Sequence, residues 1–361
     1  MRAIVRKVAG PRVAAVRSPE VNVGTTWHRN AFVDDADAHV NVRAKALQYG
    51  LGCFAGVRAY WSDARRDLYV FRLADHVARL VESARILGLA APFPAERIGE
   101  IILELLRRND CRQDTYIRPL VYVDSDELSP TMTDVPVSLS IYCLPFGRYF
   151  AHESIHCCVS SWRRVADNAI PARAKPTAAY LNSALARAEA KRNGFDEAIF
   201  LTEAGDVSEG SAEHLFLCRR GQLVSPPSTA DNLEGITRRT IIELAQADPL
   251  ELSFTERRIS RTELYVADEV FLCGTGAEVT PVSRIDHRTI ADGKVGRVTR
   301  AITERVHAVT RGADERWAHW LSPVWRDAKR SSARVPTAAR PTRRAAAASR
   351  RTPGTTRRAR T

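Results

Sequence analysis

Arg173-Ala174-Lys175-Pro176-Thr177-Ala178-Ala179-Tyr180-Leu181-Asn182-Ser183 is the stretch that decides how this chain is interpreted. From Ala174 to Ser183 its only charged side chain is Lys175. Glu209 follows 34 residues later, within a Val-Ser-Glu-Gly sequence that predicts a tight turn. The two side chains matter only if the surrounding sequence brings them into one pocket.

A lysine and a carboxylate are the two groups that pyridoxal 5'-phosphate needs from a protein. The lysine amine can form a Schiff base with the cofactor aldehyde. The carboxylate can keep the pyridine nitrogen protonated, so that the ring accepts electrons. Lys175 and Glu209 are therefore a candidate cofactor pair, although a single lysine in a sequence is most often only solvated.

Composition limits the class of protein. The 361 residues, 45% of them hydrophobic, have room for two domains with a substantial core. No run of eighteen apolar residues predicts a membrane span, and the basic segment 1–20 lacks the apolar region of a secretory signal. Seven irregularly spaced cysteines without a CxxC pair predict reduced thiols in a cytoplasmic protein and no metal site.

The net charge of +12 is concentrated at the C-terminus. Residues 328–361 contain eleven Lys or Arg and no acid, so the remainder carries about +1. This tail has almost no large apolar residue and is predicted to be disordered. It could attract nucleic acid. Since no aromatic residues are interleaved for base stacking, a solvated extension is the favoured interpretation.

Hydrophobic periodicity predicts alternating strands and helices. Helices are expected at 74–87, 94–108, 181–192, 237–247 and 295–308. Strands are expected at 53–61, 67–72, 116–123, 135–144, 155–162, 198–202, 215–218, from 223, at 250–259 and at 268–273. We predict a small N-terminal domain (1–142), an interdomain loop (143–154), a larger domain (155–312) and a C-terminal extension (313–361).

Three further segments could bind anions or substrate. Gly235-Ile236-Thr237 precedes a predicted helix, whose N-terminus suits a phosphate to which Arg79 could also bind. Gly274-Thr275-Gly276 follows a buried strand and could present backbone N–H groups. Tyr116 and Arg118 alternate along a strand and therefore share a face. Taken alone, Gly235-Ile236-Thr237 is more often an ordinary helix cap, and Arg79 a surface arginine. Gly274-Thr275-Gly276 is more often a glycine turn, and Tyr116 with Arg118 a solvent-facing strand edge.

Together these motifs resemble the class IV, or fold type IV, pyridoxal phosphate aminotransferases, and most of all the branched-chain amino acid aminotransferases. The resemblance covers about residues 30–310. It rests on Tyr49-Gly50, Phe54-Ala55-Gly56-Val57-Arg58, His76-Val77-Ala78-Arg79-Leu80, Tyr116-Ile117-Arg118-Pro119, Lys175 with Tyr180, Ser208-Glu209-Gly210, Leu233-Glu234-Gly235-Ile236-Thr237-Arg238, and Asp268-Glu269-Val270-Phe271 before Gly274-Thr275-Gly276-Ala277-Glu278.

The resemblance implies an α/β (α+β) fold with a smaller N-terminal α/β domain and a larger C-terminal pseudo-barrel domain. It implies that the protein forms at least a homodimer. It also implies the site. The catalytic lysine is Lys175, and the cofactor-binding residues are Arg79, Lys175, Tyr180, Glu209, Leu233, Gly235, Ile236, Thr237 and Thr275. The substrate-binding residues are Tyr49, Phe54, Arg58, Tyr116, Arg118, Tyr149, Thr275 and Gly276, with Arg118 receiving the distal carboxylate of 2-oxoglutarate.

The implied activity is transamination of L-leucine, L-isoleucine or L-valine with 2-oxoglutarate, a step of branched-chain amino acid biosynthesis. Four departures from the family pattern motivate an alternative, a class IV aminotransferase or lyase for a specialised donor (aromatic, D-amino acid or aminodeoxychorismate-like). They are Ala55 for a glutamate, Ala178-Ala179 for Gly-Asn, His214 for an asparagine, and Glu234 for a proline or apolar residue. A third hypothesis is a cofactor-binding protein without turnover that acts on nucleic acid through its tail.

Overall fold

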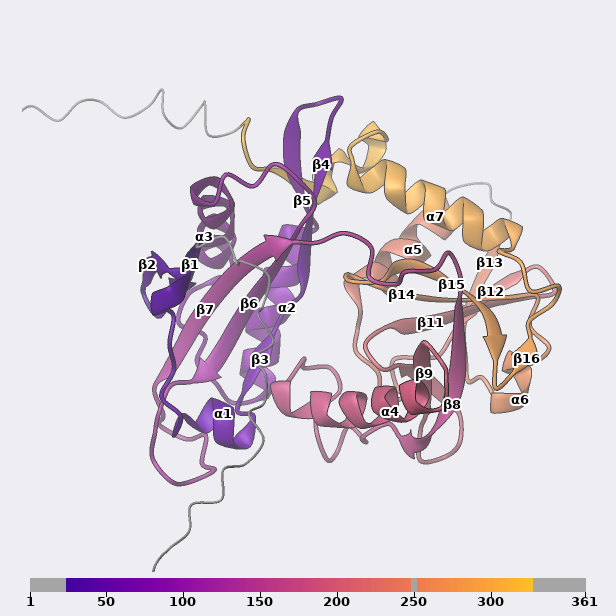
Figure 1. Ribbon diagram of the computed structural model, residues 1–361, viewed down its shortest axis with the longest axis horizontal. Coiled ribbons are helices and arrows are strands. Elements are labelled where there is room, and N and C mark those ends of the chain that lie inside the picture. Colours follow the sequence, from indigo (N-terminus) through magenta and orange to yellow (C-terminus); the bar gives the residue numbers. More distant parts are fainter. Residues whose placement is uncertain (1–23, 248–251, 327–361) are drawn as a thin grey trace, which may run out of the picture.

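The computed structural model describes residues 24–247 and 252–326. The basic segment 1–20 and the tail predicted to be disordered from about residue 328 lie outside these ranges. The described residues form two β-sheets, which lie side by side in Figure 1 with helices around them. No helix within these residues has the length and apolarity that a membrane crossing needs. All seven cysteines are free thiols.

The first sheet is antiparallel throughout and is built mainly from the N-terminal part of the chain. Its strand order is β17 (Leu321–Pro323), β5 (Asp67–Phe71), β4 (Val57–Ser62), β6 (Thr115–Val123), β7 (Val137–Pro145), β1 (Thr25–His28) and β2 (Ala31–Asp34), and β3 (Gly52–Phe54) also pairs with β6.

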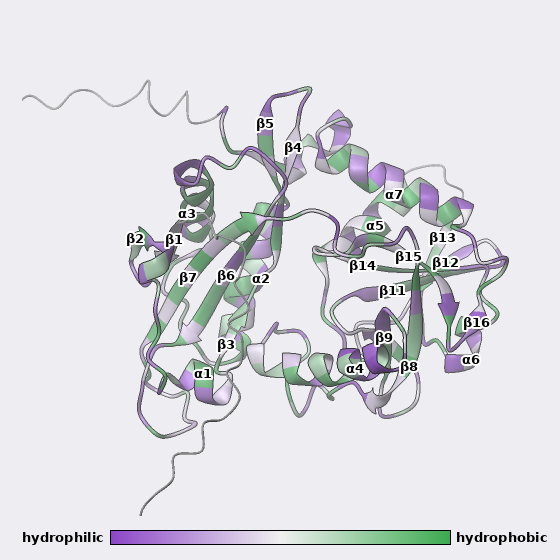
Figure 2. Cartoon of the chain, in the orientation of Figure 1, coloured by the Kyte–Doolittle hydropathy of each residue, from purple (hydrophilic) through white to green (hydrophobic). Residues whose placement is uncertain are grey.

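Helices α2 (Leu73–Ile86) and α3 (Ala95–Arg108) cover one face of this sheet. Their apolar residues recur at helical spacing, as Figure 2 shows, and they share a core with alternate strand residues such as Ile117 and Val121. Burying each large aliphatic side chain stabilises the fold by about 1.5–3 kcal/mol. The intervening residues of β6, Tyr116 and Arg118, lie on the opposite face, which the helices leave uncovered.

The second sheet is mixed. Its order is β10 (Val207–Gly210), β9 (Glu197–Leu201), β8 (Ile155–Arg163), β15 (Glu278–Ile285), β14 (Glu269–Gly274), β11 (His214–Arg219), β12 (Gln222–Ser225) and β13 (Ser253–Glu256), and β16 (Arg288–Thr289) also pairs with β15. Helix α4 (Tyr180–Arg192) packs on β8 and β9, and α5 (Ile236–Ala247) and α7 (Arg297–Thr310) pack on β14. The short helices are α1 (Lys45–Tyr49), α6 (Arg261–Leu264) and the 3₁₀ turns Asp35–Asp37, Thr177–Ala179 and Glu315–Trp320.

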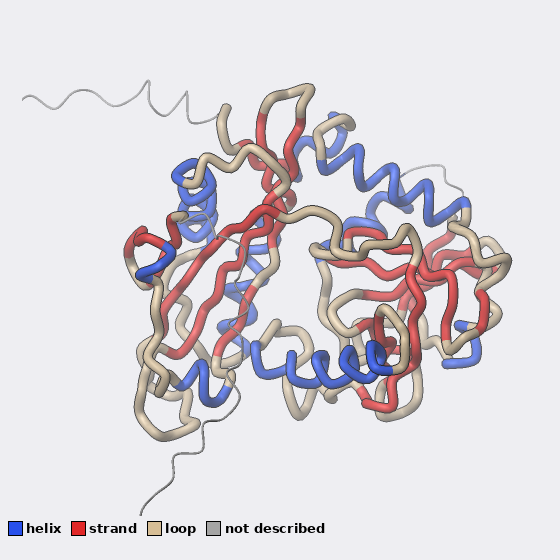
Figure 3. The backbone as a smooth tube through the Cα atoms, viewed as in Figure 1, coloured by secondary structure: helices blue, strands red, loops and turns tan. Residues whose placement is uncertain are grey.

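Several segments connect the two sheets, and two of them bear on the site. Residues 146–154 run from β7 to β8, as the tan tube of Figure 3 shows. The second connection is the lysine segment, because the N–H of Phe54 donates to the carbonyl of Lys175 at 3.1 Å and Pro176 bridges to Cys53. Thr177 Oγ1 also donates to the carbonyl of Gly50 at 2.5 Å. Lys175 therefore lies at the boundary between the two sheets.

Segments 207–210 and 313–326 are among those that differ from the sequence-based expectations. Val207–Gly210 forms strand β10 instead of a tight turn, because Val207 and Gly210 pair with β9 around a register irregularity and the chain turns only at 211–213. Residues 313–326, expected to belong to a C-terminal extension, include the 3₁₀ turn Glu315–Trp320 and β17. The edge of β5 is open to pairing, and β17 adds to it.

Candidate active site

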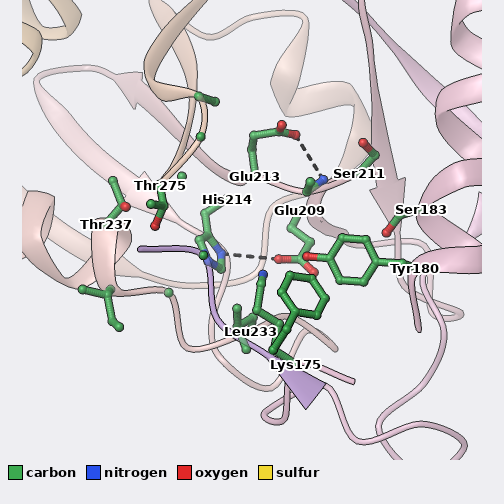
Figure 4. A pocket seen from close by; sticks show the side chains of 18 of the residues that line it. Lys175, Tyr180, Ser183, Glu209, Ser211, Glu213, His214, Leu233, Thr237 and Thr275 are labelled. Carbon is green, nitrogen blue, oxygen red and sulfur yellow. Dashed lines mark hydrogen bonds and ion pairs between the residues drawn. The ribbon is translucent and has the colours of Figure 1, made fainter. Parts of the chain in front are cut away.

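A cavity of about 350 Å³ lies between the two sheets. It brings together fourteen of the sixteen residues that the sequence nominated, from elements far apart in the chain. These are Phe54, Arg79, Tyr116, Arg118, Tyr149, Lys175, Tyr180, Glu209, Leu233, Gly235, Ile236, Thr237, Thr275 and Gly276. Figure 4 shows the part of the cavity around Lys175, Tyr180 and Glu209.

Lys175 is the amine of the cavity. Burial lowers its pKa to about 7, and the nearby guanidinium of Arg79 acts in the same direction, whereas Glu209 opposes the shift. The Nζ atom lies 5.4 Å from the ring centroids of both Phe54 and Tyr180. An ordinary lysine is fully protonated at neutral pH. Lys175 is instead divided between its protonated form and a neutral, nucleophilic form.

Glu209 is held by a neighbour that the sequence did not nominate. Arg164 Nη2 lies 2.9 Å from Glu209 Oε1, and both side chains are more than nine-tenths buried. Burial raises the pKa of Glu209, while Arg164 and Lys175 lower it and thus favour the carboxylate. The available signal was the pair Arg163-Arg164, the last residue of β8 and the one after it, because alternation directs one of two adjacent side chains inward.

One end of the cavity suits an anion. The first residues of α5, Ile236 and Thr237, line it, so the unpaired N–H groups and the positive end of the helix dipole are nearby. Arg79 lines the same cavity and donates from Nη1 to the carbonyl of Glu234 at 3.1 Å. Burial lowers the pKa of Arg79 to about 10.

The acidic side chain of Glu234 does not oppose this anion site. Its carboxylate lies 3.3 Å from Arg173 Nε, and the side chains are 59% and 46% exposed, respectively. The carboxylate therefore points to solvent, and only the backbone carbonyl of Glu234 contacts Arg79. An outward-pointing, paired charge has little influence on a buried anion.

The opposite wall comes from the uncovered face of the first sheet. Arg118 donates from Nη2 to the hydroxyl of Tyr116 at 2.7 Å, and its guanidinium lies 4.2 Å from the ring centroid of Phe54. A Cβ at Gly56 would overlap the Tyr116 hydroxyl, so glycine is required there. The wall thus combines aromatic surface with one cation, and can contact either an aliphatic chain or a carboxylate.

A second polar cluster lies behind Tyr149. Arg187 donates to the Tyr149 hydroxyl and lies 3.4 Å from Oε2 of the fully buried Glu197. Glu213 lines the cavity and accepts from the N–H of Ala212 at 3.1 Å. Burial raises the pKa of Glu213 to about 8, and the charge of Glu197 acts in the same direction. Glu213 is therefore mainly protonated at neutral pH.

Two nominated residues do not line this cavity. Tyr49 ends α1 and is 37% exposed. Arg58 is 3% exposed and donates to the carbonyls of Gly147 at 2.9 Å and Gly276 at 3.2 Å. Its guanidinium therefore joins the interdomain loop to the turn between β14 and β15, and its role in the structure is to support the wall.

The departures at Ala55 and Ala178 are accommodated locally. Ala55 is buried in the core, and Glu278, 3.4 Å from Arg58 Nη1, supplies a carboxylate for this arginine. Although position 55 carries no glutamate, the carbonyl contacts of Arg58 and its ion pair with Glu278 hold the guanidinium in place. Ala178 packs against Gly50, where a Cβ would lie 3.1 Å from that of Ala178 and where φ is +68°.

The cavity fits pyridoxal 5'-phosphate in charge and in chemistry. It has an amine with a lowered pKa, a carboxylate held by an arginine, and a helix N-terminus next to Arg79. Among the described residues, Arg79 makes no ion pair with a carboxylate, so a partly buried cation remains for a phosphate. The same described residues contain no cluster of three or more His, Cys, Asp or Glu that could hold a metal ion.

Comparisons with known proteins agree with this geometry. Residues 52–285 match the family described as amino-transferase class IV. A probable branched-chain-amino-acid aminotransferase of Aquifex aeolicus is 42% identical over 290 residues, which are 80% of this chain and 93% of that protein. The crystal structure of a branched-chain aminotransferase from Thermoproteus uzoniensis with norvaline is 42% identical with a TM-score of 0.80, covering 84% of this chain and 99% of that one.

A second solved structure contains the cofactor. It is the branched-chain amino acid aminotransferase from Thermobaculum terrenum in its PLP-form, or holo-form. It is 37% identical to this chain, with a TM-score of 0.80, and the match covers 84% of this chain and 99% of that chain. The similarity thus spans both sheets and nearly the whole length of each relative.

Proposed function

Because this chain belongs to the class IV aminotransferases, we propose that it transfers the amino group of L-leucine, L-isoleucine or L-valine to 2-oxoglutarate, using pyridoxal 5'-phosphate. The observation that carries the proposal is the joint placement of Lys175, Glu209 and Arg118 around one cavity. The relatives named as branched-chain aminotransferases, including one solved with norvaline, support this choice of donor.

In this proposal the cofactor lies between the two sheets. Arg79, Thr237, Thr275 and the N-terminus of α5 hold its phosphate, and Glu209 holds its pyridine nitrogen. When bound, pyridoxal phosphate supplies an aldehyde that accepts the amine and a ring that withdraws electrons from the substrate Cα. Tyr180, whose pKa burial raises to about 12, keeps its hydroxyl proton and can donate it to an oxygen of the ring.

Lys175 holds and moves the proton. With a pKa of about 7, its amine can accept a proton from the substrate Cα at neutral pH and return it afterwards. A general base works best when its pKa lies near the working pH. Before the cofactor binds, the neighbouring guanidinium of Arg79 also favours the unprotonated amine.

The substrate occupies the remainder of the cavity. Phe54, Tyr116 and Tyr149 give apolar surface to a branched side chain, and Arg118 gives a charge-assisted hydrogen bond to the distal carboxylate of 2-oxoglutarate. The turn at Thr275 and Gly276 offers backbone N–H groups to the α-carboxylate of either substrate. One cavity can therefore receive both substrates in turn.

The finer assignments belong to the same proposal. We propose a homodimer in the cytoplasm. Tyr49, half-exposed and outside the cavity of its own chain, is free to contribute to the cavity of a second copy. The seven free thiols suit a reducing compartment. The boundary between the two domains at 143–154 and the roles of the individual site residues also remain predictions.

Purified protein loaded with pyridoxal phosphate should convert L-leucine and 2-oxoglutarate to L-glutamate and the branched 2-oxo acid. Chromatography measures the formation of both products. Lys175→Ala should abolish the conversion. A panel containing L-phenylalanine, D-alanine and D-leucine distinguishes the alternative. If a donor of that panel is used while leucine, isoleucine and valine are not, the enzyme acts on a specialised donor and the proposed substrate class is wrong.

A further inference from the structure

The carboxylate of Glu209 has a second basic neighbour besides Arg164. His214, the first residue of β11, places Nδ1 3.4 Å from Glu209 Oε2, while Arg164 lies on Oε1. Figure 4 shows the imidazole and the carboxylate directly facing each other, with Lys175 beside them. His214 is 6% exposed and Glu209 is also 6% exposed, so water contributes little at either group.

The position of the imidazole is fixed by the backbone around it. A Cβ at Gly235 would overlap Nε2 of His214, so the ring packs directly on the glycine that leads into α5. The ring thus lies between Gly235 and Glu209 and has little freedom to turn away. Its Nδ1 is buried and makes no hydrogen bond among the residues that the structure describes.

The ring is neutral in this environment. Burial lowers the pKa of His214 well below its ordinary value, and the cations Arg238, Lys175, Arg79 and Arg164 act in the same direction. A neutral imidazole carries one N–H and one lone pair. A lone pair on Nδ1 would face the negative oxygen of Glu209, whereas an Nδ1–H would be attracted to it. The tautomer protonated on Nδ1 is therefore favoured.

We propose that His214 is a positioning residue that donates Nδ1–H to Glu209 and so keeps the carboxylate ionised and oriented towards the pyridine nitrogen of the cofactor. This inference rests on the proposed function, because it requires pyridoxal phosphate in the cavity. A shift of either side chain by a few tenths of an ångström brings the two atoms into hydrogen-bonding distance. Arg164 and His214 then bind one oxygen each.

The expected consequence is a change in the protonation of the cofactor ring. Burial raises the pKa of Glu209, whereas Arg164, Lys175 and a backbone hydrogen bond from Leu233 lower it. An imidazole donor at the carboxylate acts in the same direction as these three groups. Removing the imidazole donor raises the carboxylate pKa further and weakens its hold on a protonated pyridine. A hydrogen bond to a charged group is worth enough to change cofactor affinity about tenfold.

The first experiment measures the ring nitrogen directly. Protein is loaded with ¹⁵N-labelled pyridoxal phosphate, and the ¹⁵N chemical shift is recorded for wild type, His214→Leu and His214→Asn. We expect a protonated nitrogen in wild type and in His214→Asn, whose amide is also a donor. In His214→Leu the shift should move towards that of unprotonated pyridine, with about tenfold weaker cofactor binding by fluorescence titration.

A matched control separates this effect from loss of stability. His28 is a buried histidine of the first sheet that contacts the hydroxyl of Ser140 at 2.8 Å and the carbonyl of His39 at 3.0 Å, and it does not line the cavity. His28→Leu should lower the melting temperature and leave the ring ¹⁵N shift unchanged. A wild-type shift in His214→Leu, or a failure of His214→Asn to restore it, would overturn the inference.

A measurement on the unmutated protein covers the case in which His214→Leu does not fold. With ¹⁵N-labelled histidine, the holoenzyme should show His214 as the neutral tautomer protonated on Nδ1. The Nε2–H tautomer or an imidazolium would refute the inference while leaving the proposed function standing. Wild-type protein that takes up no pyridoxal phosphate would instead refute the proposed function, and this inference with it.

Discussion

The replacement of Arg79 by methionine tests the electrostatic basis of Lys175 reactivity. The two cations line the same cavity, and Arg79 is the largest contribution after burial to the low pKa of Lys175. With a pKa of about 7, half of the Lys175 amine is unprotonated at pH 7, against roughly 0.03% for an ordinary lysine. The depression corresponds to about 5 kcal/mol of differential interaction between its two protonation states.

In Arg79→Met the burial of Lys175 remains and one positive charge is lost. A neighbouring charge shifts a pKa by about 1–2 units, so Lys175 should titrate at about 8–9. The unprotonated fraction at pH 7 then falls from about half to between roughly 1% and 10%. Glu209→Gln should act in the opposite direction, because it removes the charge that raises the lysine pKa.

Competitive acetylation of the apoprotein from about pH 5 to about pH 11, a range that brackets both lysine pKa values, measures this titration by mass spectrometry. Lys294, with an 83% exposed side chain, is the internal reference within the same sample. Arg85→Met, on the exposed surface of the same helix, is the matched control and should leave Lys175 unchanged. The reasoning is refuted if wild-type Lys175 titrates together with Lys294, or if Arg79→Met has the same titration as wild type.

Three further substitutions test other parts of the site. Lys175→Met should abolish amino transfer. It should also stabilise the apoprotein by up to about 5 kcal/mol, measured by urea unfolding below pH 7. Because the pKa of Lys175 is lower in the folded than in the unfolded protein, this stabilisation should shrink as the pH rises from about 7 to 10.5. Arg118→Leu should raise the KM for 2-oxoglutarate about 10–100-fold and that for leucine much less, in steady-state kinetics. Arg58→Met removes the hydrogen bonds of a buried guanidinium to the carbonyls of Gly147 and Gly276, and should lower the free energy of unfolding by about 3 kcal/mol; an unchanged unfolding midpoint would show that its contacts are dispensable.

The regular elements were predictable where a simple period governs them. Helices α2, α3 and α4 begin and end within about one residue of the expected bounds, because one stripe of each is apolar or small and the other polar. The strand expected at 53–61 is divided into β3 and β4 around Ala55 and Gly56. Gly56 lies at this interruption, where the Tyr116 hydroxyl occupies the space that a side chain would need.

Site residues that belong to sequence motifs could be predicted, whereas two arginines could not be placed correctly from the sequence. Tyr116 and Arg118 follow from strand alternation, and Ile236 with Thr237 from the start of a helix. Arg164 was missed because alternation at Arg163-Arg164 indicates that one side chain turns inward, but only the fold shows that Glu209 lies beside it. Arg58 was assigned to substrate, but its carbonyl acceptors lie on two loops whose proximity only the folded chain reveals.

The overall charge of the chain conceals the charge that matters for function. The net charge of +12 is largely a property of the C-terminal tail. The cavity itself gathers Lys175, Arg79, Arg118 and Arg164, and Glu209 is the carboxylate that opposes them, since Glu213 is mainly protonated at neutral pH. Such a cluster destabilises the folded apoprotein, because buried like charges repel each other and lose hydration.

Ligands that carry several negative charges reverse this cost. A phosphate at the N-terminus of α5 and a carboxylate at Arg118 would neutralise the excess positive charge of the cavity. Binding would therefore remove the repulsion among these cations and stabilise the folded protein. In the protein without cofactor, burial and Arg79 both lower the pKa of Lys175 and favour its neutral form. Once the phosphate pairs with Arg79, that second effect weakens and the Lys175 pKa rises. The same arginine would thereby make the lysine reactive towards the cofactor first, and bind the cofactor afterwards.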